Sequence, residues 1–81
     1  MSYTPELVAE LEILALFNLG SSQEGLKIHQ TAAPKAIAAA QRLFDKELIT
    51  QPDGGYLTSL GRDAAEHAQG LLTILAVQEA A

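Results

Sequence analysis

The residues of this chain best suited to chemistry are cations placed along one predicted helix. Lys35, Arg42 and Lys46 recur within residues 34–47 at intervals that bring them onto one helix face, with Gln41 at its edge. Only alanine methyl groups lie between the cations, so this face could approach a phosphate backbone closely. The pattern predicts contact with double-stranded DNA. An ordinary solvated face with a local ion pair between Arg42 and Asp45 is the alternative.

Other candidate chemistry is weak. The chain has no cysteine and two histidines, His29 and His67, at no recognised ligand spacing, so we expect no metal site. The run Asp53-Gly54-Gly55 is not followed by the lysine-bearing helix of a phosphate loop. No serine has the context of a nucleophile elbow. We therefore expect no catalytic residue, no cofactor and no enzymatic activity.

Two helices are predicted in the first half of the chain. The first covers about residues 5–19, with Thr4 as N-cap, Pro5 at the first helical position and Gly20 as the stop. Its core stripe is expected at Leu7, Leu11, Leu14 and then Leu16 or Phe17. The second helix is capped by Thr31 and runs to about Glu47. Its core face is expected at Ile37, Phe44 and Leu48, with Ala40 and Leu43 beside them. The opposite face carries Lys35, Arg42 and Lys46, and Ala38 and Ala39 lie between these cations.

The segment 22–29 is compatible with two structures. Ser22 could cap a short helix, which would be the first helix of a helix-turn-helix, and we favour such a helical turn. The alternation of Leu26 and Ile28 with polar neighbours fits a short strand instead. A strand would leave the helix-turn-helix incomplete and weaken the DNA interpretation.

The run from 43 to 65, LFDKELITQPDGGYLTSLGRDAA, predicts a β-hairpin and a new helix start. Leu48 and Ile49 begin the first strand, residues 52–55 make the turn, and Tyr56 and Leu57 belong to the second strand. Thr58 is the predicted N-cap of the next helix. This order resembles the wing of a winged helix-turn-helix domain, through the residues Leu43, Leu48, Ile49, Asp53, Gly54, Gly55, Tyr56, Leu57, Thr58, Gly61 and Arg62.

The resemblance implies a mainly α fold of three to four helices with a small β-hairpin wing. The whole chain, 1–81, is then a single domain, with the wing at about 48–58 and the C-terminal helix at about 58–78. The run from Gly25 to Ala68 is also similar to a small family of uncharacterised gammaproteobacterial proteins of about 80 residues, which implies a bacterial origin. DNA-binding wings usually carry a cation at the tip, whereas this tip carries Asp53.

Charge and composition leave two functions open. The formal net charge of −5 disfavours nucleic acid, yet four of the five basic residues lie between positions 27 and 46, with Asp45 as the only acid there. The first hypothesis is a small DNA-binding transcriptional regulator. The alternative is a winged-helix module for protein–protein interaction without DNA binding.

The second half of the C-terminal helix is more apolar than so small a domain needs. We therefore predict that Leu71, Leu72 and Leu75 form an interface with a second copy or another protein. The apolar runs are too short to span a bilayer and the N-terminus has no signal-peptide pattern, so we expect no membrane partner and a cytoplasmic location.

Overall fold

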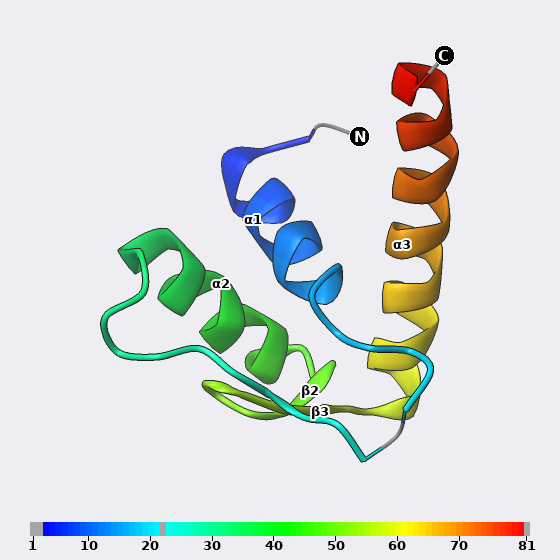
Figure 1. The fold of residues 1–81 in the computed structure, drawn as a ribbon. Coiled ribbons are helices and arrows are strands. Elements are labelled where there is room, and N and C mark those ends of the chain that lie inside the picture. The colour runs from blue at the N-terminus through cyan, green and yellow to red at the C-terminus, as the bar shows by residue number, and fades with distance from the viewer. Residues whose placement is uncertain (1–2, 22, 81) are drawn as a thin grey trace.

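The computed structural model describes residues 3–21 and 23–80. Within these ranges the chain forms three helices and one three-stranded antiparallel sheet (Figure 1). The elements are α1 (Pro5–Leu14), β1 (Leu26–Lys27), α2 (Pro34–Asp45), β2 (Ile49–Gln51), β3 (Gly54–Leu57) and α3 (Ser59–Ala80). The fold is mostly α with a small hairpin and is winged-helix-like, as the sequence predicts.

Helix α1 begins as predicted but ends earlier. The Thr4 hydroxyl accepts a hydrogen bond from the Leu7 amide (3.1 Å), which confirms the N-cap. The helix ends at Leu14 instead of residue 19. Its buried face is made by Ala9, Glu10, Ile13 and Leu14, with Phe17 beyond it, so the prediction that Leu7 and Leu11 are core residues is wrong.

The segment after α1 contains a strand, which corrects the preference for a helical turn. Leu26 and Lys27 form β1 and pair antiparallel with Gly55 and Gly54 of β3. A Cβ atom on Gly54 would overlap the Leu26 carbonyl oxygen, so glycine is needed for this pairing. The predicted cap at Ser22 lies outside the described residues. Within residues 23–33 no helix forms, so α2 alone connects β1 to β2.

The predicted β-hairpin is confirmed. Strand β3 lies between β1 and β2. The turn is made by Pro52 and Asp53 alone, and Gly54 and Gly55, which the sequence places in the turn, are the first residues of β3, both at positive φ (130° and 72°). The Thr50 hydroxyl accepts a hydrogen bond from the Tyr56 amide (2.9 Å) across the pair.

Backbone caps join the hairpin to the helices on either side. Glu47 follows α2 in a left-handed conformation (φ 64°), and the Leu48 amide donates back to the Leu43 carbonyl (2.9 Å), which is a Schellman ending. Thr58 caps α3 as predicted, its hydroxyl accepting from the Gly61 amide (3.0 Å) and donating to the Glu47 carbonyl (2.7 Å). The predicted Thr31 cap is wrong, because Ala33 holds the N-cap position of α2 without a side-chain hydrogen bond.

The core lies where the three helices meet the sheet. Leu43 and Ile49 are its largest fully buried side chains, and the alanines Ala39, Ala40 and Ala65 allow the helices to approach closely. Gln69 of α3 donates to the carbonyls of Leu14 and Phe17 (3.1 and 2.7 Å), which satisfies backbone acceptors at and beyond the end of α1. No helix among the described residues is long and apolar enough to cross a bilayer.

Candidate functional site

The cations of α2 meet a buried carboxylate on α1. Glu10 is 5% exposed, and its carboxylate accepts hydrogen bonds from Arg42 Nε (2.8 Å) and from Lys46 Nζ. Arg42 Nη2 also donates to the carbonyl of Glu6 (3.1 Å). Two of the four residues predicted to contact DNA therefore hold α1 against α2.

The electrostatics of Glu10 follow from this geometry. Burial alone would raise the pKa of the Glu10 carboxyl group, but hydrogen bonds from Lys46 and Arg42, together with their charges, outweigh burial and hold that pKa below its usual value. Glu10 is therefore ionised at neutral pH, and it offsets part of the positive charge on which the DNA prediction depends.

The orientation of α2 explains why its cations reach α1. Ala39, Ala40 and Leu43 point into the core, whereas Ile37 and Phe44, predicted as core residues, are exposed. The observed core face of α2 is therefore rotated about the helix axis relative to the predicted one, because Ala39, predicted on the outer face, is fully buried. A small residue there lets α1 come close, which places Arg42 and Lys46 at the border between the two helices.

The outer face of α2 carries little positive charge. Gln41 Nε2 donates to the carboxylate of Asp45 (3.0 Å), and the anticipated local pair between Arg42 and Asp45 is replaced by this contact. Lys35 is exposed near the start of α2, and among the described residues it has no ion pair. The four predicted residues therefore do not form one solvent-facing cationic stripe.

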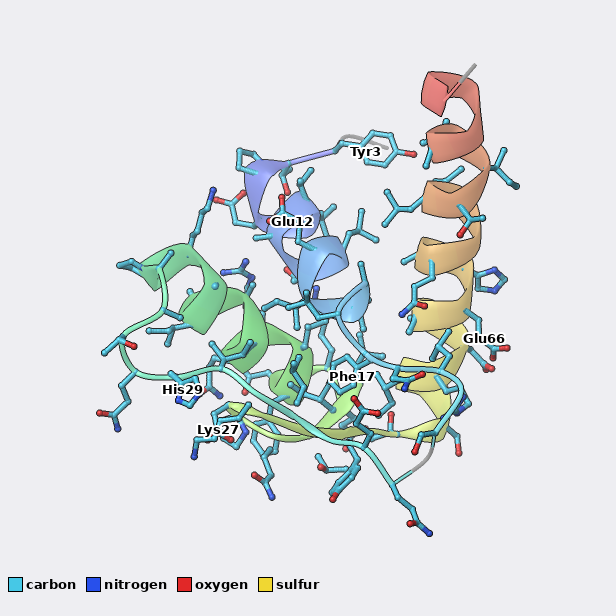
Figure 2. All side chains as sticks on the ribbon, viewed as in Figure 1. Tyr3, Glu12, Phe17, Lys27, His29 and Glu66 are labelled. Carbon is cyan, nitrogen blue, oxygen red and sulfur yellow. The ribbon has the colours of Figure 1, made fainter. Side chains whose placement is uncertain are left out.

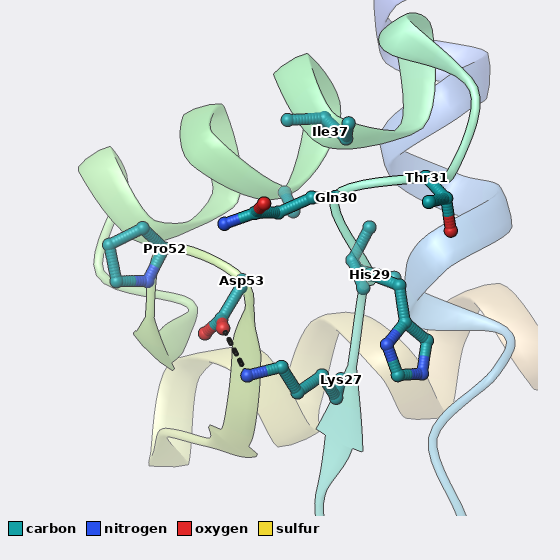
Figure 3. A pocket seen from close by; sticks show the side chains of 9 residues that line it. Lys27, His29, Gln30, Thr31, Ile37, Pro52 and Asp53 are labelled. Atoms are coloured by element: carbon teal, nitrogen blue, oxygen red, sulfur yellow. Dashed lines mark ion pairs between the residues drawn. The ribbon is translucent and has the colours of Figure 1, made fainter.

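A groove of about 540 Å³ lies between α2, the loop after β1 and the tip of the wing (Figure 3). Ile37 and Pro52 lie on two sides of it, and Lys27 and Asp53 form an ion pair at one end (3.3 Å). This pair neutralises the cation nearest the wing tip. His29 lines the groove, but the described residues hold no group of three potential metal-ligating side chains.

Large apolar side chains are exposed on α1 and on the second half of α3, two segments that lie at the same end of the molecule (Figure 1). They include Leu7 and Leu11 of α1 and Leu71, Leu72 and Leu75 of α3, and we call these leucines the α1–α3 surface. The sequence predicts an interface at the α3 residues and places Leu7 and Leu11 of α1 in the core. No local signal in the sequence sets Leu7 and Leu11 apart from core residues, because their exposure follows from the contact of Glu10 with Arg42 and Lys46 on α2.

The order of elements and the capped hairpin define a winged-helix-like domain with a single helix between β1 and β2. The chain belongs to the family of unknown function DUF5669, whose model matches residues 1–76. This agrees with the resemblance to a family of uncharacterised proteins. Comparison with curated proteins and with solved structures finds no significant match.

Proposed function

We propose that the protein is a winged-helix-like module for protein–protein interaction and that its partner binds to the α1–α3 surface. The observation that carries the proposal is the exposure of the leucines on that surface. Leu72 is 48% and Leu75 is 50% exposed, although both belong to a helix whose first half is packed into the core. Several large apolar side chains exposed at one end of a small domain are typical of an interaction site.

The charges of the domain favour this function over DNA binding. A DNA-binding helix needs cations that are free to neutralise phosphates. Here Arg42 and Lys46 are engaged by Glu10, and Lys27 is engaged by Asp53. The domain also lacks a helix within residues 23–33, where the first helix of a helix-turn-helix would lie.

Site-specific photo-crosslinking in living cells tests the interaction. A photo-crosslinking amino acid in place of Leu75 is expected to give a discrete covalent adduct. The same amino acid in place of Gln51, exposed on β2, is the matched control and is expected to give none. Absence of an adduct at Leu75, or equal adducts at both positions, would refute the proposal.

DNA contact through Lys35, Gln41, Arg42 and Lys46 is the competing proposal, and it has its own test. NMR titration of the protein with mixed-sequence duplex DNA at low salt is expected to leave the amides of 35–46 unshifted. A salt-dependent affinity that falls when Arg42 and Lys46 are replaced by alanine would instead establish DNA binding.

A further inference from the structure

The groove between α2, the loop after β1 and the wing tip is separate from the α1–α3 surface. None of the described residues that line it belongs to that surface. Lys27 and His29, which line it, lie at the lower left of Figure 2, well apart from Tyr3 and from the C-terminal half of α3. Its volume of about 540 Å³ is within the range of sites that bind ligands, so the groove is large enough to hold a ligand of its own.

Two apolar side chains form walls of the groove. Ile37 of α2 and Pro52 of the wing lie on two sides of it, and the buried Ala40 lines it from the inner face of α2 (Figure 3). Both walls are in contact with water, since Ile37 is 39% exposed and Pro52 is also exposed. A large apolar side chain placed between Ile37 and Pro52 would remove both from water, and that burial would favour binding.

The polar groups of the groove offer donors and acceptors together without a net charge. At one end, the Lys27 ammonium group and the Asp53 carboxylate form an ion pair (3.3 Å) that is open to solvent. Gln30, which is exposed, extends its amide group across the groove towards Pro52 (Figure 3). The ion pair and the Gln30 amide each present one donor group beside one acceptor group. A peptide bond has the complementary N–H and C=O groups, whereas a charged ligand would have to compete with the ion pair.

The groove is shallow. Of the residues that line it, only Ala40 is fully buried, Ile28 and Asp53 are half-buried, and the others are exposed. Sites for small molecules usually enclose most of the ligand surface. A shallow groove instead suits a peptide, because one side chain enters the groove while the backbone stays at its rim.

From these observations we infer that the groove binds an uncharged, extended peptide segment of another protein. One large apolar side chain of that segment lies between Ile37 and Pro52. The peptide bonds on either side of this residue form hydrogen bonds with the Gln30 amide and with the pair of Lys27 and Asp53. This second binding surface goes beyond the proposed function and does not depend on the partner of the α1–α3 surface.

NMR titration of the full chain with capped tripeptides tests the inference. The probes are N-acetylated, C-amidated tripeptides with glycine at both ends and phenylalanine, leucine, glutamate or lysine at the centre. Phenylalanine and leucine peptides should shift the backbone amide signals of residues 27–31, 37 and 53 in a saturable way, with dissociation constants on the order of 1 mM. Glutamate and lysine peptides should bind at least about fivefold more weakly, because they bring a charge and little apolar surface into the groove.

Two variants test the apolar wall and the amide. Ile37→Ala and Gln30→Ala should each raise the dissociation constant of the phenylalanine peptide by at least about threefold. Phe44→Ala is the matched control and should leave that constant unchanged, because Phe44 is also exposed on α2 (36%) but does not line the groove. If a variant fails to fold, NOEs between the phenylalanine ring and the Ile37 methyl groups in the wild-type complex decide, and their absence overturns the inference.

The outcomes separate this inference from the proposed function. The absence of a saturable shift with every peptide, or shifts centred on α3, overturns the peptide site. Equal affinities for the phenylalanine and glutamate peptides do the same. Toluene supplies the apolar group without peptide bonds, so toluene binding as tight as that of the phenylalanine peptide would make the groove a small-molecule site and overturn the inference. None of these results affects the proposed function, which is decided by the crosslinked adduct from Leu75.

Discussion

Glu10→Gln tests whether the ion pairs between α1 and α2 stabilise the fold. The carboxylate accepts hydrogen bonds from Arg42 and Lys46 while being almost fully buried itself. Glutamine has nearly the same shape but no charge, and it keeps only one acceptor oxygen. The substitution therefore leaves two cations beside a neutral group at little steric cost.

The magnitude follows from the exposure of the partners. Hydrogen bonds to charged groups contribute about 1.5–3 kcal/mol each when buried. The Arg42 and Lys46 side chains are 33% and 49% exposed, so water replaces part of what is lost. We expect Glu10→Gln to lower the free energy of unfolding by about 1–2 kcal/mol, which in a domain of this size lowers the Tm by roughly 5–15 °C. Chemical and thermal denaturation at pH 7 measure both, with Glu12→Gln as the control because Glu12 is exposed on the same helix.

The pH dependence gives a second readout. The pKa of Glu10 is lowered in the folded state, so its stabilising contribution is present above the unfolded pKa, about 4.3, and is lost as the pH falls through the folded value. The stability difference between wild type and Glu10→Gln should therefore shrink below about pH 4.3. A Glu10→Gln variant as stable as Glu12→Gln at pH 7, or a difference that does not shrink in acid, would refute the reasoning.

Three further substitutions probe the backbone of the domain. Gly61→Ala should destabilise it by roughly 3 kcal/mol, because the added Cβ would overlap the carbonyl oxygen of Leu48. An added Cβ at Gly70 on the same helix meets no atom within 4 Å, so Gly70→Ala should instead stabilise the domain by up to about 1 kcal/mol through helix propensity. Equal changes in Tm for Gly61→Ala and Gly70→Ala would contradict the packing of α3 on the hairpin. Glu47→Gly should stabilise by about 1 kcal/mol, because Glu47 occupies a left-handed position at the end of α2, and a lower Tm for this variant would count against the Schellman ending.

The wing could be predicted because its structure is determined locally. A proline and two glycines fix the turn, and Thr58 lies next to the helix that it caps. The chemistry of such a hairpin is contained in about ten adjacent residues, so no distant contact is needed to infer it. The same holds for Thr4 and Pro5 at the start of α1.

Strand β1 and the orientation of α2 could not be predicted in this way. Two residues, Leu26 and Lys27, form a strand because they pair with Gly55 and Gly54, nearly thirty positions away. In α2, the hydrophobic pattern placed Ile37 and Phe44 in the core, since larger side chains gain more from burial. The close approach of α1 instead selects the small residues Ala39 and Ala40 for the inner face.

The contact of Glu10 with Arg42 and Lys46 affects both the predicted DNA-binding face and the α1–α3 surface. With the carboxylate of Glu10 directed at Arg42 and Lys46, the rotation of α1 about its axis is fixed, and Leu7 and Leu11 lie outside the core. The same ion pairs therefore engage the cations that DNA would need and position the leucines that a partner would contact. If the proposed function is right, Glu10→Gln should reduce the photo-crosslinked adduct formed from Leu75 as well as the stability of the fold, whereas Glu12→Gln should change neither. A Glu10→Gln protein that is less stable but gives an unchanged adduct from Leu75 would mean that packing alone, through Ile13 and Leu14, fixes the orientation of α1.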